Sequence, residues 1–97
     1  MITTKQRATL RGLANTLDPV MQIGKEGLTD NSFVELDNLF EARELFKIKV
    51  LKNCDFTARE LASAIKEKTG CEIVQCIDNK IILYKKSTRK NFRHIEI

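Results

Sequence analysis

The sequence predicts a single-domain α/β (α+β) fold built from three helices and four strands. Two observations support this prediction. Apolar residues recur at helical spacing in three segments and at strand spacing in others, and capping or turn-forming residues separate the segments. In addition, 97 residues can enclose one hydrophobic core but not two. The expected order is helix, strand, helix, strand, helix, strand, strand.

The first helix is expected to begin after Thr3, because Thr3 and Gln6 have the spacing of a capping box. Its apolar stripe consists of Leu10, Leu13, Ala14 and Leu17. Proline disfavours helical geometry in the residue before it, so Asp18-Pro19 should end the helix. The short apolar run 20–23 then predicts a buried strand.

The second helix should follow the loop Gly24-Lys25-Glu26-Gly27 and carry an acidic outer face. Three residues after the loop can each cap it: Thr29, Asp30 and Asn31. Its stripe consists of Phe33, Leu36, Leu39, Phe40 and Arg43. The period then changes to two over 45–51, which predicts a strand with an apolar face and a basic face. Lys47 and Lys49 lie on the basic face.

The third helix is framed by a second capping box, Thr57 with Glu60, and by Gly70 at its C-terminal cap. Its stripe consists of Ala58, Leu61, Ala62 and Ile65. The β-branched runs 72–77 and 80–85 surround Asp78-Asn79, which predicts a tight hairpin. Helical connections between the first three strands favour parallel pairing, with the antiparallel hairpin completing the sheet.

Composition narrows the function classes. The chain carries a net charge of +4, concentrated in alternating basic and acidic segments, which is compatible with one basic and one acidic face and with a polyanionic partner. No apolar run approaches the about 20 residues of a membrane-spanning helix. We expect a cytoplasmic protein, because the first residues lack the pattern of a signal peptide. The three cysteines fit reduced, mostly buried thiols.

No catalytic set is recognisable. The single histidine, His94, lies near the end of the chain, and no Cys-x-x-Cys pair is present to begin a zinc site. Gly24-Lys25 lacks the spacing of a phosphate-binding P-loop. We therefore expect no enzyme activity, no cofactor, no metal and no small-molecule substrate.

The loop Gly24-Lys25-Glu26-Gly27 is the strongest candidate site. Two glycines allow the backbone to approach a ligand closely, Lys25 adds a mobile cation, and the following helix directs its N-terminal N–H groups toward the loop. KH domains clamp an RNA backbone with a Gly-x-x-Gly loop of this kind. A strand-to-helix turn without any ligand has the same pattern, so both interpretations stay open.

Aromatic residues offer little support for base stacking. Phe33, Phe40 and Phe46 occupy core-facing positions, and Phe56 adjoins a helix cap, so packing is expected for all four. Tyr84 and Phe92 could serve either purpose. Phosphate and shape contacts should therefore dominate any RNA binding.

Considered together, several segments resemble the single-domain, YhbY-like members of the CRM family (chloroplast RNA splicing and ribosome maturation). The matching segments are 4–6, 10–14, 17–20, 23–29, 41–48, 74–77 and 81–85. The resemblance implies a four-stranded mixed sheet related to the C-terminal domain of bacterial translation initiation factor three. The RNA-binding domain would span residues 1–86, followed by a basic tail, 87–97, that we expect to be extended or mobile.

The resemblance also implies a function: RNA binding and association with precursors of the large ribosomal subunit. It assigns RNA contacts to the loop residues and to three basic positions: Gly24, Lys25, Glu26, Gly27, Lys5, Arg11 and Lys47. A monomer is expected. The alternative is a protein-interaction adaptor whose basic or acidic face docks on a ribosomal or other protein.

Overall fold

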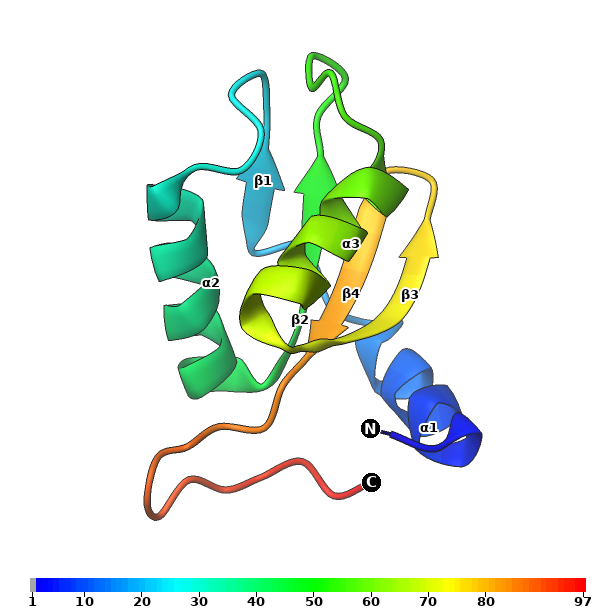
Figure 1. Ribbon diagram of the computed structural model, residues 1–97. Coiled ribbons are helices and arrows are strands. Elements are labelled where there is room, and N and C mark those ends of the chain that lie inside the picture. The colour runs from blue at the N-terminus through cyan, green and yellow to red at the C-terminus, as the bar shows by residue number, and fades with distance from the viewer. Residues whose placement is uncertain (1) are drawn as a thin grey trace.

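The computed structural model describes residues 2–97 as three helices and a four-stranded mixed sheet (Figure 1). The elements in chain order are α1 (Thr4–Ala14), β1 (Met21–Ile23), α2 (Asp30–Arg43), β2 (Leu45–Val50), α3 (Ala58–Thr69), β3 (Glu72–Ile77) and β4 (Lys80–Tyr84). The predicted order of helices and strands is confirmed. α2 and α3 cover one face of the sheet, and α1 packs on the other.

The strands lie in the order β1-β2-β4-β3. β1 and β2 pair in parallel, as predicted. The expected parallel pairing of β3 is wrong, because β4 lies between β2 and β3 and is antiparallel to both. The two-residue turn forces β4 to return beside β3. β4 then occupies the interior of the sheet, where its side chains after Lys80 are buried on both faces.

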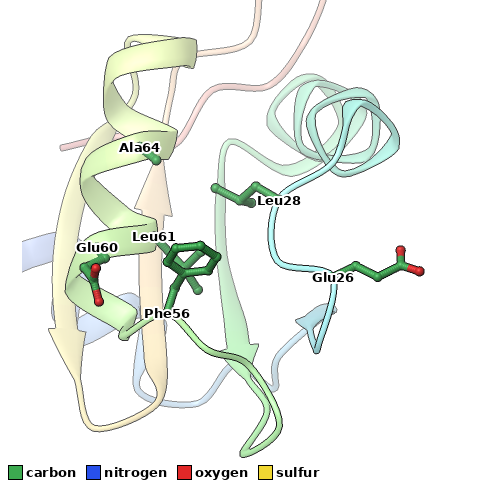
Figure 2. A pocket seen from close by; sticks show the side chains of 6 residues that line it. All are labelled: Glu26, Leu28, Phe56, Glu60, Leu61 and Ala64. Atoms are coloured by element: carbon green, nitrogen blue, oxygen red, sulfur yellow. The ribbon is translucent and has the colours of Figure 1, made fainter.

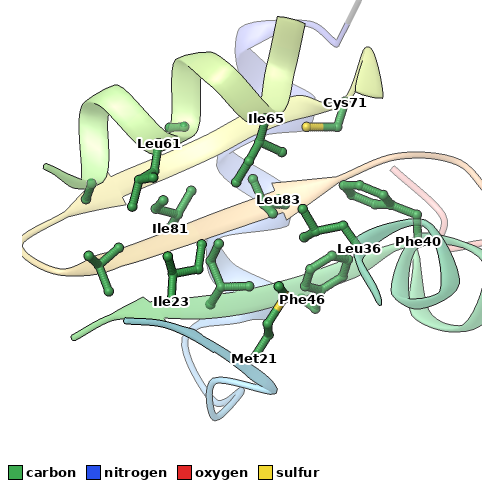
Figure 3. Packing of buried hydrophobic residues seen from close by; sticks show 14 residues of the cluster. Met21, Ile23, Leu36, Phe40, Phe46, Leu61, Ile65, Cys71, Ile81 and Leu83 are labelled. Atoms are coloured by element: carbon green, nitrogen blue, oxygen red, sulfur yellow. The ribbon is translucent and has the colours of Figure 1, made fainter. Parts of the chain in front are cut away.

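The larger hydrophobic cluster lies between the sheet and the helices α2 and α3 (Figure 3). Phe40 of α2 and Phe46 of β2 contact each other, with ring centroids 4.9 Å apart. Ile81 of β4 packs in the same cluster as Leu61 and Ile65 of α3. The predicted alternation of β2 is confirmed, since its even-numbered apolar side chains enter this cluster while its lysines are on the opposite side.

α1 closes a smaller cluster on the opposite face. Leu10 and Ala14 are buried there against side chains of β2, β3 and β4. The expected burial of Leu13 and Leu17 is wrong: Leu13 is 47% exposed, and Leu17 lies beyond the end of the helix. α1 rests on a single surface, so only a narrow side of it is covered. Arg7 holds α1 to the start of β3 by donating to the carbonyl of Ile73.

Side-chain caps set the helix starts. The two predicted capping boxes, Thr3 with Gln6 and Thr57 with Glu60, are both present. Of the three candidates for the second helix, Thr29 is the cap, and it forms a reciprocal pair with Ser32. α3 ends at Gly70 in the left-handed conformation (φ +75°), where glycine has no steric penalty.

The C-terminal residues beyond β4 run back along the domain, so that the two ends of the chain lie near each other (Figure 1). Ile95 and Ile2 both pack against the smaller cluster. The segment 87–97 has no helix or strand. Hydrogen bonds hold it to the C-terminal end of α2: Ser87 Oγ donates to the Glu41 carbonyl oxygen, and the Thr88 N–H donates to the Glu41 carboxylate.

Glu44 is the centre of this attachment. It lies between α2 and β2 with an unusual φ of +63° and is 0% exposed. Its carboxylate accepts hydrogen bonds from the N–H groups of Ser87 and Ile95, both at 2.8 Å, and contacts Nδ1 of His94 at 2.5 Å. Burial is the largest influence and raises the pKa of Glu44, but the hydrogen bonds together outweigh it and leave the pKa below 4.5.

Replacing Glu44 should therefore destabilise the domain. In Glu44→Ala, the N–H groups of Ser87 and Ile95 lose their acceptor. Alanine also has a Cβ, so the strain of the positive φ at this position is unchanged. We expect the free energy of unfolding to fall by about 3 kcal/mol, measured by urea denaturation. Glu35→Ala, at an exposed position of α2, is the matched control and should change little. Equal effects of the two substitutions would contradict the assigned role of Glu44.

The attachment should also weaken in acid. Hydrogen bonds from Thr88 and Ser87 lower the pKa of Glu41 from 4.5 to about 2. A depressed pKa in the folded state stabilises the protein above the unfolded value, and this contribution disappears as the pH falls. The amide resonance of Thr88, whose N–H donates to this carboxylate, should therefore shift as the pH falls through about 2. In Glu41→Gln, that pH-dependent shift should be largely absent; a shift of the same size would show that another group is responsible.

Candidate nucleic-acid interface

The loop Gly24–Gly27 lies at the carboxyl end of β1 and connects it to α2 (Figure 1). The N–H of Gly27 donates to the carbonyl of Gly24 at 3.0 Å, which closes a tight turn. Lys25 and Glu26 are exposed at its tip. A hydrogen bond ties the end of β1 to the segment that follows β2: the Leu51 N–H donates to the Ile23 carbonyl at 2.8 Å. The loop is therefore an exposed tip on a fixed base.

The two glycines have different roles. Gly27 has φ +66°, and a Cβ there would lie 3.3 Å from two atoms of the Phe56 ring. Gly24 has no positive φ, and a Cβ there would be in ordinary contact, 3.5 Å from Asn53 Oδ1 and Leu51 Cδ1. Only Gly27 is thus required by conformation and space, whereas Gly24 can be changed without loss of the turn.

The N-terminus of α2 is less favourable for an anion than its position suggests. Thr29 Oγ1 already accepts the N–H of Ser32 at 3.2 Å. Asp30, in the first turn, adds a negative charge near the same helix end. Any phosphate held at the loop must therefore depend mainly on Lys25 and the loop backbone.

A groove of about 560 Å³ lies beside the loop, between its base and α3 (Figure 2). Leu28, Phe56 and Leu61 face one another across it, while the carboxylate of Glu26 points away. The expectation that Phe56 is packed is only partly correct. One side of its ring covers Gly27, but 51% of the residue is exposed, because it precedes the Thr57 cap and lies outside the helix stripe.

The three predicted basic positions do not join the loop. Lys5 and Arg11 are on α1, which packs on the sheet face opposite α2 and α3. Lys47 lies in the middle of β2 on that same face. The loop projects from the opposite end of the sheet to α1 (Figure 1). The structure therefore separates the predicted site into a loop and a basic sheet face.

Sequence reasoning missed some residues of the basic face. The period of β2 correctly predicts that Lys49 lies on the basic face of the strand, but it does not indicate that Lys49 belongs to a binding site. Lys80 is its direct neighbour on β4, which only the strand register reveals. Burial of Glu44 gave no sequence signal, because an acidic residue at a helix end is ordinarily exposed.

The cysteines, the possible metal ligands and the helix lengths bear on redox, metal-binding and membrane functions. The three cysteines are free, with Cys71 buried and the others partly covered. Over residues 2–97, no group of three His, Cys, Asp or Glu side chains is arranged to hold a metal ion. None of the helices described is both long and apolar enough to cross a membrane.

The fold and its exposed loop define a small single-domain α+β protein. Residues 2–85 match the CRS1 / YhbY (CRM) domain, and the chain belongs to this family. The resemblance noted from the sequence is thereby confirmed.

Similar proteins come from several bacteria. The Probable RNA-binding protein YqeI of Bacillus subtilis is 40% identical over 97 residues, covering 100% of this chain and 99% of the relative. A protein of Haemophilus influenzae named RNA-binding protein is 36% identical over 86 residues, covering 89% and 87% of the two chains. The solution structure of SAV1595 from Staphylococcus aureus has a TM-score of 0.76 and 40% identity, and the match covers 95% of each chain.

The two glycines of the loop should respond differently to alanine. Gly27→Ala places a Cβ at positive φ and against Phe56, so the free energy of unfolding should fall by about 1–2 kcal/mol. Gly24→Ala is the matched control and should leave stability within about 0.5 kcal/mol of the wild type. Thermal or urea denaturation measures both. A larger loss of stability for Gly24→Ala than for Gly27→Ala would mean that the turn depends on Gly24 and would contradict this assignment.

Proposed function

We propose that this protein is a cytoplasmic, non-catalytic RNA-binding protein that acts in assembly of the large ribosomal subunit, by binding precursor ribosomal RNA. The observation that carries the RNA-binding part is the end-to-end similarity to relatives named RNA-binding proteins, at 40% and 36% identity. The ribosomal part rests on the resemblance to YhbY-like proteins. The exposed loop and the basic sheet face supply a physical mode of binding.

In this proposal the loop acts as a backbone clamp. Gly24 and Gly27 add no side chain to the turn, and a sugar-phosphate chain would approach the peptide groups of its exposed tip. Lys25 extends from the exposed tip and reaches a phosphate. Glu26 repels phosphate, and its carboxylate points away from the adjacent groove.

The basic positions on the other side of the sheet add positive charge that attracts RNA. Lys5, Arg11 and Lys47 are exposed or half-buried, and the acidic residues Glu35 and Asp37 lie on the outer face of α2, across the sheet. Phe40 and Phe46 are enclosed in the core and cannot stack on bases. Binding by charge and shape, with a modest preference for sequence, is the mode that these residues support.

Changing the loop should weaken RNA binding without unfolding the protein. Lys25→Glu and Gly24→Asp should each lower the affinity for a fluorescein-labelled RNA hairpin at least about tenfold, while the wild-type affinity falls steeply with salt because each phosphate contact releases counterions. Fluorescence anisotropy measures the affinity, and thermal denaturation checks the fold.

Arg43→Glu is the matched charge reversal for the loop test, at the opposite end of α2 from the loop. It should weaken binding far less than Lys25→Glu. Undiminished binding by both loop variants would leave Gly24–Gly27 as a structural turn. Absence of wild-type RNA binding at low salt would reject RNA binding itself and favour the adaptor alternative.

The ribosomal target can be tested separately. Crosslinking in cells, followed by sequencing of the bound RNA, should enrich precursors of large-subunit ribosomal RNA over other abundant RNAs. Enrichment of unrelated RNA would remove the ribosomal part of the proposal and leave RNA binding intact.

A further inference from the structure

The side of the sheet opposite α2 and α3 is only partly covered. Leu10 and Ala14 of α1 pack on its lower part, against residues that include Leu45 and Tyr84. Toward the β3–β4 turn, the face carries lysines instead. We use the term open sheet face for three of these residues, Lys47, Lys49 and Lys80.

Like charges are placed side by side on the open sheet face. Lys49 of β2 and Lys80 of β4 are direct partners in the antiparallel register. Directly opposed like charges destabilise a sheet. Among residues 2–97 the ion pairs involve Arg7, Lys66 and His94, so none of the three lysines of the open sheet face is neutralised by a carboxylate. A like-charge pair that costs stability and forms no ion pair among the described residues fits an external polyanion.

A hollow of about 190 Å³ lies between Lys47 and Lys80. This volume is well below the roughly 300 Å³ at which small-molecule pockets begin, so the hollow suits one group of a longer ligand. Its lining combines amides, apolar side chains and a single carboxylate: Gln75, Asn79, Ile77, Ile82 and Asp78. Amides can pair with the edge of a base, and the isoleucines provide an apolar floor.

We propose that the open sheet face is a second RNA contact, distinct from the loop, in which Lys47, Lys49 and Lys80 bind neighbouring phosphates of one strand and the hollow holds one nucleotide unit. This inference rests on the RNA binding proposed above. Lys47 and Lys49 are two residues apart on one strand, about 6.6 Å, which is comparable with the separation of neighbouring phosphates. The inference assigns Lys47 to this face rather than to the loop and adds Lys49 and Lys80.

Lys80→Glu separates binding from stability. It replaces a repulsive cross-strand pair with an attractive one, so at low salt its Tm should rise by roughly 1–5 °C. RNA affinity should fall at least about tenfold in the same variant. Because a better-folded protein that binds less cannot be explained by unfolding, this combination identifies a contact. The probe is a fluorescein-labelled RNA hairpin with a single-stranded loop, followed by fluorescence anisotropy.

The salt dependence of RNA affinity measures how many phosphate contacts the protein makes. Replacing Lys47, Lys49 and Lys80 together with glutamine should reduce the slope of log affinity against log salt by about 2–3, as expected for three lost phosphate contacts. Arg59→Glu is the matched control: it reverses one exposed charge, and it lies on α3, across the sheet from the open sheet face. It also adds an acid to the first turn of a helix, so it too should not lower the Tm.

The possible outcomes are distinguishable. If the wild type does not bind the hairpin, the proposed function fails. A second outcome is that the wild type binds the hairpin and that Lys25→Glu weakens binding but Lys80→Glu does not. The inference about the open sheet face is then overturned, while the proposed function stands. If the wild type binds labelled polyglutamate as tightly as RNA and Lys80→Glu weakens both equally, the face recognises acidic proteins and the inference is likewise overturned.

Discussion

The alternation of side chains along β2 is the constraint on which both the core and the basic face depend. Phe46, Ile48 and Val50 anchor the larger hydrophobic cluster, and Lys47 and Lys49 emerge on the reverse side of the same strand. A one-residue shift of register would exchange the two sets, burying the lysines and exposing the aromatic ring. Fold and charge distribution are therefore determined by the same hydrogen bonds, to β1 on one side and to β4 on the other.

Local patterns predicted the elements well because their causes are local. Two capping boxes and the left-handed Gly70 depend on residues a few positions apart, and these were assigned correctly. The position of β4 within the sheet is not predicted by such local patterns, because it depends on competition between strands that are distant in sequence. An apolar run that is buried on both faces is most stable inside a sheet, which is where β4 lies.

The candidate site was predicted as a set of residues but not as an arrangement. The loop Gly24–Gly27 and Lys47 were identified by residue type, yet the distance between them along the sheet could not be inferred from spacing in the sequence. Pairing of Lys49 with Lys80 depends on register, and the exposure of Phe56 depends on the neighbouring loop. Long-range contacts of this kind have no signature within a short window of sequence.

The buried carboxylate of Glu44 has a consequence for where the folding unit ends. The match to the family covers residues 2–85, yet the three groups that satisfy this carboxylate belong to Ser87, His94 and Ile95. A fragment cut at the family boundary would retain every helix and strand but lose the segment that supplies all three of these contacts. The residues that match the family domain and the residues that satisfy Glu44 thus end about ten positions apart in this chain.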